Sequence, residues 1–170
     1  CPAGEENLPV RWAALLGALG EADTRRVLKR LRCSNACIEE TAVLVRETAG
    51  QGVCRSFSEE KASANPGDIH LRQLLGRYGL CTVERLCALC AALHPQAAPA
   101  CALAAQRARQ LEADGVCCRV SQLAVNGRDL MAAGIPAGPA LRRVLEALLD
   151  GVIRAEYPNE KTALLAAAQK

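Results

Sequence analysis

The chain has 170 residues and 51% of them are apolar, so it is long enough to bury a core in one domain or two small ones. Its formal net charge is only +3, which excludes a uniformly basic nucleic-acid binder but allows a local basic patch. The sequence holds neither an apolar run of the roughly 18 residues that span a bilayer nor a secretory signal near its start. These features predict a cytoplasmic protein without membrane contact, and the lack of Met before Cys1 suggests a piece of a longer chain.

Ala and Leu dominate the apolar half and aromatic residues make up only 2% of the chain, which favours an all-α fold with no sheet. The first third predicts helices over residues 8–19, 22–31 and about 35–48, with Ser34 as the N-cap of the third. The first of these helices carries large apolar side chains on one face: Leu8, Trp12, Leu15, Leu16 and Leu19.

Residues 50–67 mix Gly, Ser, Asn and Pro, which predicts a loop with one short helix over about 57–62. Asp114 and Gly115 end a later helix, and we place a boundary there between a helical body, 1–115, and a smaller helical tail, 116–170. The helices predicted after the loop cover residues 68–78, 82–94, 95–113 or 98–113, 121–124, 128–133, 139–155 and 160–169.

Ten cysteines are spread along the chain, many at helix positions that Ala or Leu would fill, such as Cys33, Cys37 and Cys101. In a reducing compartment such residues pack as small apolar side chains, so we expect all ten to be unpaired and metal-free. The spacing of Cys87, Cys90 and His94 resembles that of metal ligands. No second pair completes the set, and core packing is the better interpretation.

The turn at residues 134–138 is the most informative local feature of the predicted tail, because Pro139 then starts a helix at its first position. A helix N-terminus offers unsatisfied backbone N–H groups and partial positive charge, and Arg142 and Arg143 lie one turn further on. Gly138 and these two arginines therefore form a candidate phosphate site. An ordinary helix hairpin is the alternative.

A run of basic side chains in the second predicted helix forms another candidate. Arg25, Lys29 and Arg32 follow an i, i+4, i+7 spacing that aligns them on one helix face, and no acid lies within the run 25–32. Such a stripe can follow a phosphate backbone, because Lys and Arg neutralise phosphates. The alternative is a solvated face balanced by acids on other helices.

The sequence holds no complete set of catalytic groups. His70 has only Asp68 nearby, in the position of a helix cap, and Glu21 and Asp23 stand at a helix start, where acids complement the dipole. No phosphate-binding Gly-rich loop follows a strand, and no carboxylate pair has the context of a two-metal site. We therefore expect no catalytic residue, metal or cofactor within this chain.

Four short motifs follow one another along the tail: LAVNGRDL at 123–130, GIPAGP at 134–139, Val152-Ile153 and Asn159-Glu160. In this order they resemble the C-terminal end of bacterial tRNA nucleotidyltransferases, the CCA-adding enzymes related to poly(A) polymerases. Nearer the N-terminus, RWAALL at 11–16 and LKRLRCSN at 28–35 resemble the body of such enzymes. Residues 50–113 resemble them only in helical character.

In that family a catalytic head holds two metal-binding aspartates, a neck selects CTP and ATP, and a helical body and tail grip the acceptor arm and elbow of tRNA. The resemblance implies tRNA as a partner, together with the head and neck of the same polypeptide. Neither the head nor the acid-acid-x-x-Arg signature of the neck is present here, so Mg²⁺ and CTP or ATP are expected only with the missing head. The resemblance thus predicts a transferase fragment for tRNA processing that is inactive alone.

Arg128 joins the RNA-binding candidates because it lies within the motif at 123–130. Its alternative is a structural one, in which Asp129 is stabilised by the helix dipole and Arg128 faces solvent. Two other functions compete with tRNA binding for the whole chain. One is a standalone helix-hairpin-helix-like module that binds nucleic acid through residues 134–139, and the other is a helical protein-interaction scaffold.

Overall fold

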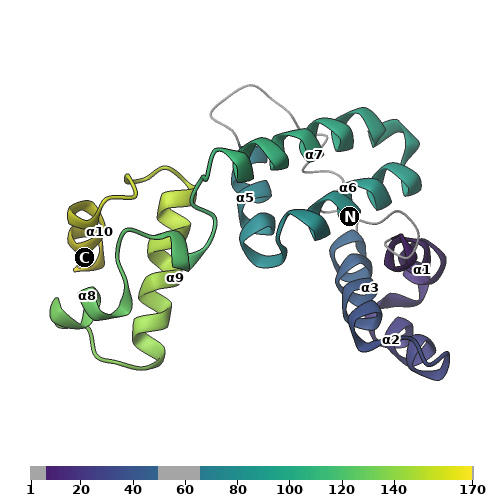
Figure 1. Ribbon diagram of the computed structural model, residues 1–170, viewed down its shortest axis with the longest axis horizontal. Coiled ribbons are helices and arrows are strands. Elements are labelled where there is room, and N and C mark those ends of the chain that lie inside the picture. Colours follow the sequence, from purple (N-terminus) through teal and green to yellow (C-terminus); the bar gives the residue numbers. More distant parts are fainter. Residues whose placement is uncertain (1–6, 50–65, 170) are drawn as a thin grey trace.

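The computed structural model describes residues 7–49 and 66–169, whose regular secondary structure consists of α-helices and short 3₁₀ turns with no strand. The predicted all-α class is confirmed. Figure 1 shows an elongated molecule in which three groups of helices follow one another along the long axis. None of the helices in the described ranges has both the length and the apolar character that crossing a bilayer requires. The short helix predicted over 57–62 lies outside these residues.

The N-terminal group contains α1 (Leu8–Leu16), η1 (Gly17–Leu19), α2 (Gly20–Arg30) and α3 (Asn35–Thr48). Both α1 and α2 pack against α3. The Ser34 side chain caps α3 as predicted, accepting a hydrogen bond from the Cys37 backbone N–H at 3.3 Å.

The apolar face noted for residues 8–19 is not the face that α1 buries. Leu15 is 71% exposed, whereas Pro9 and Ala13 are buried. Ala13 shares a core with Leu44 of α3 and Leu89 of α6, and its small side chain allows α1 to lie close to these helices. Packing against neighbours therefore overrides the apolar pattern of α1.

The central group contains α5 (Pro66–Tyr78), α6 (Leu80–Leu93), η3 (Pro95–Ala97) and α7 (Ala98–Ala113). Its core joins the inner faces of the three α-helices, including Leu75, Val83 and Leu111. The helix α6 begins at Leu80 and not at Thr82, because Gly79 adopts φ +79° as its N-cap and turns the chain sharply after α5.

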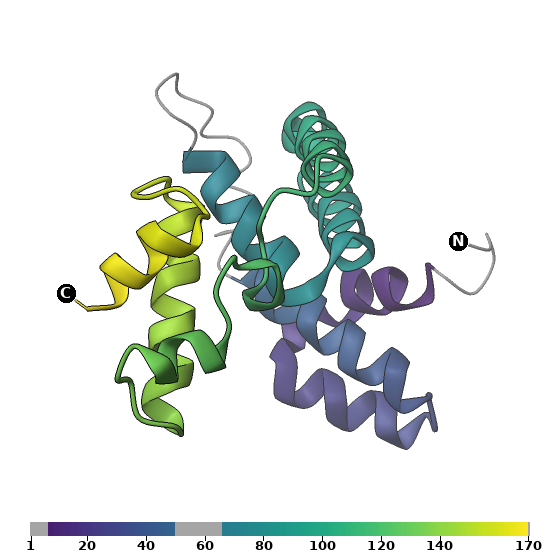
Figure 2. The same cartoon turned by 60° about the vertical axis from the view of Figure 1, so that its left-hand side comes forward.

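The C-terminal group contains η4 (Val120–Gln122), α8 (Gly127–Ala132), α9 (Pro139–Ile153) and α10 (Lys161–Ala168). Leu130, Leu148 and Leu164 bring α8, α9 and α10 into one core. Figure 2 shows this group as a separate bundle beside α5, with the chain crossing to it from the end of α7.

The packing prediction is confirmed for several of the cysteines that the structure describes, whereas Cys81 is exposed and Cys33 and Cys37 are only partly buried. Cys87, Cys101, Cys117 and Cys118 are free and buried, and burial raises the pKa of Cys87 to about 12. Cys90 is disulfide-bonded, so the prediction that all ten cysteines are unpaired is wrong at this position. A buried helix position makes a thiol a good packing residue, but it does not prevent the thiol from forming a disulfide when another thiol is near.

Candidate nucleic-acid interface

One face of α5 joins the central group to the C-terminal group. Gln73 donates a hydrogen bond from Nε2 to Oδ1 of Asp150 in α9 at 3.0 Å. Gly76 lies directly against the chain after α7, since a Cβ at this position would be 2.0 Å from the carbonyl oxygen of Cys118. Only glycine allows this close approach between α5 and the segment that links α7 to η4, which we call the linker.

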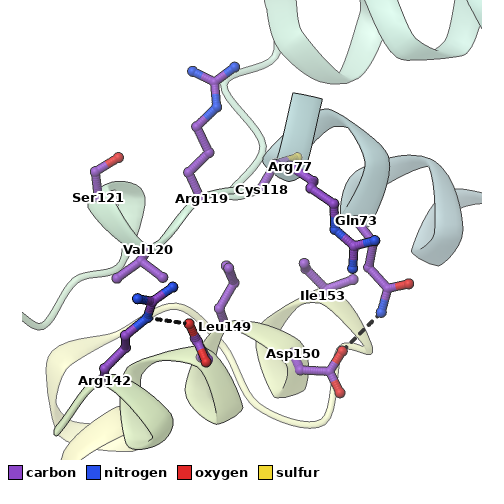
Figure 3. A pocket seen from close by; sticks show the side chains of 12 residues that line it. Gln73, Arg77, Cys118, Arg119, Val120, Ser121, Arg142, Leu149, Asp150 and Ile153 are labelled. Atoms are coloured by element: carbon purple, nitrogen blue, oxygen red, sulfur yellow. Dashed lines mark hydrogen bonds and ion pairs between the residues drawn. The ribbon is translucent and has the colours of Figure 1, made fainter. Parts of the chain in front are cut away.

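A cleft of about 680 Å³ lies at this junction, between α5, residues 118–121 and α9. Figure 3 shows Arg77 and Arg142 reaching toward the cleft from opposite walls, whereas Arg119 points away from it at the rim. The apolar residues among its lining are Val120, Leu149 and Ile153.

The acids at the cleft leave part of its positive charge uncompensated. Arg142 is exposed and donates a hydrogen bond from Nε to Glu146 at 2.8 Å, one turn away on α9. Arg77 makes no ion pair with any described residue, and its guanidinium lies 5.9 Å from the ring centroid of Tyr78. Solvent screens exposed ion pairs such as that of Arg142, so a phosphate group can displace Glu146 at little cost.

The other acid of the cleft, Asp150, is fully engaged. Besides accepting the hydrogen bond of Gln73, it forms an ion pair with Arg154 at 2.8 Å. At the rim, Arg119 forms a long ion pair of 3.6 Å with Glu112 of α7. Arg77 is therefore the cation of the cleft that is most available to an anionic ligand.

The tail turn has the predicted geometry at the start of α9. Gly138 is the N-cap with φ +118°, Pro139 occupies the first turn, and no side chain caps the helix. Arg143 is exposed like Arg142, but it does not line the cleft. The structure therefore brings only one of the two predicted tail arginines into the cleft.

Arg128 stands at the start of α8 beside a complete capping box. The Asn126 side chain accepts from the backbone N–H groups of Arg128 and Asp129, and Asp129 accepts in return from the Asn126 N–H at 3.0 Å. An ion pair with Lys161 at 2.6 Å further lowers the pKa of Asp129. Asp129 thus has the structural role given as the alternative, while the Arg128 side chain is exposed.

The basic stripe predicted for the second helix is not continuous. Arg32 lies beyond the end of α2, with φ +56°, because the helix stops at Arg30. Arg25 is held by two carboxylates, Glu21 at 3.1 Å and Glu39 of α3. Lys29 is exposed on α2. The absence of acids within the run did not predict unpaired arginines, because Glu39 lies on another helix and Glu21 lies one turn before Arg25.

Sequence reasoning missed the two α5 arginines at the junction, Arg72 and Arg77, and also Arg119. A signal was present in the four-residue spacing between Arg72 and Gly76, which puts a cation and a close-approach glycine on one helix face. That signal cannot name the partner, which lies some 80 residues away in α9.

Comparison with known proteins matches residues 74–168 to a family described as tRNA nucleotidyltransferase domain 2, a range that includes most of the cleft and all of α6 to α10. A CCA-adding enzyme of Levilactobacillus brevis is 53% identical over 45 residues, which cover 26% of this chain and 11% of that enzyme. The chain thus matches only a small part of that relative's length, and no solved structure matches. Because the family match extends over more than half of the sequence, the chain belongs to the tRNA nucleotidyltransferase family.

Proposed function

We propose that this chain is the C-terminal, tRNA-binding part of a tRNA nucleotidyltransferase, and that a head and neck of the same polypeptide add CCA to the tRNA 3′ end. The observation that carries the proposal is the cleft between α5 and α9, which Arg77 and Arg142 enter from opposite walls within the region of the family match. Lys and Arg side chains supply most of the affinity for nucleic acid by neutralising phosphates and releasing counterions.

The division into a body, 1–115, and a tail, 116–170, is part of this proposal. Two adjacent residues support it, because Cys118 packs into the core of the central group while Cys117 packs into the core of the C-terminal group. The chain thus leaves one core and enters the next just after Gly115. Body and tail are then two rigid units that can grip different parts of one RNA.

The second contact is proposed at the end of α2, where Lys29 on the helix and Arg32 just beyond it are exposed. Figure 1 shows α2 at the opposite end of the long axis from the C-terminal group. A ligand that touches both must be long, as is a tRNA from its acceptor arm to its elbow. Binding at two separate points would hold the acceptor end at a fixed place relative to the head.

The test is fluorescence anisotropy with labelled tRNA at several salt concentrations. We expect the double variant Arg77→Gln/Arg142→Gln to bind more weakly and to reduce the slope of log affinity against log salt by up to about one to two units. Arg109→Gln is the matched control, since Arg109 is an exposed α7 arginine that pairs with Glu84 outside the cleft.

Unchanged affinity and slope in the double variant would refute the cleft as an RNA site. Tighter binding of duplex DNA than of tRNA would favour the helix-hairpin-helix module, and the absence of salt-dependent binding to either nucleic acid would favour a protein-interaction scaffold.

A further inference from the structure

We propose that Arg72 is a positioning residue that fixes the orientation of the tail on the body, and so sets the spacing between the two RNA contacts. The inference rests on the proposed function, because the spacing matters only if body and tail bind one RNA. Arg72 itself does not line the cleft and has no role in contacting the ligand.

The guanidinium of Arg72 joins three segments of the chain. From α5 it donates to the carbonyl of Ile153, the last residue of α9, at 3.0 Å, and to the carbonyl of Cys117 in the linking segment at 2.9 Å. A longer contact of 3.5 Å reaches the carbonyl of Val152. One side chain therefore holds both the linker and the end of α9 against α5.

The chemistry of this contact suits arginine. The last carbonyls of a helix have no intrahelical N–H partners and carry the negative end of the helix dipole, so a cation at the end of α9 is stabilised there. The planar guanidinium donates to several carbonyls from separate nitrogen atoms in a fixed fork, whereas the donors of a lysine ammonium all belong to one nitrogen at the end of a flexible stem. The Nε of Arg72 is buried without a hydrogen-bond partner, which shows that the side chain is enclosed at the junction.

Other contacts also hold the tail against the body, and they lie on the same face of α5 as Arg72. The hydrogen bond between Gln73 and Asp150 lies beside Arg72, and Gly76 lets the linker approach one turn later. Figures 1 and 2 both show the C-terminal group beside α5, with α8 and α10 farther from it. Loss of the Arg72 contacts would therefore let α9 rotate about this face while each core stays folded.

Orientation affects RNA binding through effective concentration. When one contact has formed, the second is intramolecular, and its contribution falls if the two sites no longer match the spacing of the ligand. A variant at Arg72 should therefore weaken the binding of a ligand that spans both sites. It should affect a ligand that reaches one site less, because the binding of that ligand does not depend on the spacing between the two sites.

The experiment compares the wild-type chain with Arg72→Lys, which keeps the charge and removes the multiple hydrogen bonds. Two labelled RNAs are used, an intact tRNA and the acceptor-stem hairpin cut from it. We expect Arg72→Lys to bind the intact tRNA about tenfold more weakly, with an unchanged salt slope, and to lose clearly less affinity for the hairpin, which reaches one contact only. Arg107→Lys is the control, since Arg107 bridges α5 and α7 within the body by bonding to Asp68.

Small-angle X-ray scattering without RNA gives a second readout, in which Arg72→Lys should broaden the distribution of interatomic distances while circular dichroism shows the same helix content. The milder variant Gln73→Ala should change both readouts in the same direction by less. Equal losses for tRNA and hairpin, or wild-type affinity and scattering in Arg72→Lys, would overturn the inference. A wild-type chain that binds neither RNA would refute the proposed function. The scattering would then still test whether Arg72 holds the tail in a fixed orientation on the body.

Discussion

The basic run of α2 and the cleft between α5 and α9 each contain arginines that acids neutralise beside basic side chains that stay available. In α2, Arg25 is held by Glu21 and Glu39, and Arg26 pairs with Asp23 at 3.0 Å. In the cleft, Arg77 has no ion pair with any residue that the structure describes. Farther along the α2 run, Lys29, Arg30 and Arg32 are exposed and also have no ion pair with a described residue. Basic residues of a single run therefore differ in availability, because acids from the same and neighbouring helices neutralise some of them and leave others free.

This difference shows why a count of Lys and Arg does not locate an anion site. The field at a surface depends on every charge within about a Debye length, which is about 8–10 Å in physiological salt, and not only on charges in the same helix. Three arginines brought together from α5, the linker and α9 are far apart in the sequence. Their proximity arises only when the C-terminal group docks on α5.

The largest expected effect comes from distorting the cleft while leaving α2 intact. Gly76→Ala places a methyl group 2.0 Å from the Cys118 carbonyl oxygen, so α5 and the linker must separate. We expect a loss of about 1–3 kcal/mol in the free energy of unfolding, measured with urea, together with weaker tRNA binding. Gly17→Ala is the control, because a Cβ there meets no atom within 4 Å. Wild-type stability in Gly76→Ala would show that the junction is looser than described.

A matched pair of single substitutions tests the comparison of the two regions directly. Arg77→Gln should weaken tRNA binding and lower the salt slope by about one unit, because it removes one phosphate contact. Arg26→Gln should change neither, since Arg26 is already paired with Asp23. Anisotropy titrations measure the tRNA affinity and salt slope of both variants. An effect of Arg26→Gln as large as that of Arg77→Gln would show that the ion pair with Asp23 does not keep Arg26 from binding RNA.

Much of the fold could be predicted from the sequence because helix ends are set locally. Ser34 caps α3 through a hydrogen bond three residues away, and Pro139 starts α9 at its first position. The buried face of α1 could not be predicted, because it depends on α3 and α6, which approach Ala13 from elsewhere in the chain. The same reason applies to the cleft. Arg142 could be selected from the turn before it, but its neighbour Arg77 could not.

The core of α5 to α7 should lose stability at alkaline pH. Burial raises the pKa of Cys87, in the core of α5 to α7, to about 12, against about 8.5 for an unfolded thiol. The folded state then holds this proton more tightly, so the contribution of Cys87 to stability is full below about pH 8.5 and is lost as the pH rises toward 12. Urea unfolding at pH 8 and pH 10 should show a decline of about 1–2 kcal/mol.

The control for this decline is Cys87→Ala, which removes the titrating group. Its stability should be lower at pH 8 but should fall less between pH 8 and pH 10 than that of the wild type. Burial also raises the pKa values of Cys101 and Cys118 in the same core, so part of the decline should remain. A decline identical to that of the wild type would assign the pH dependence to other groups.

The smallest effect is expected at Arg25, which pairs with two carboxylates and therefore has a structural role. Its hydrogen bonds to Glu39 and Glu21 raise the pKa of the guanidinium and lower the pKa of the Glu39 carboxyl. Solvent screens ion pairs of this kind, so Arg25→Gln should destabilise the chain only slightly near neutral pH.

The pH dependence of this small loss identifies its cause. Because the pKa of Glu39 is lowered by folding, its contribution is present above the unfolded pKa of a glutamate, about 4.3, and disappears as the pH falls through the lower folded value. The stability difference between wild type and Arg25→Gln should therefore shrink in acid. If Arg25 instead serves RNA, its substitution should lower the salt slope of tRNA binding by about one unit and leave the unfolding free energy unchanged. Measuring both quantities on one variant separates a residue that binds α2 to α3 from one that binds a phosphate.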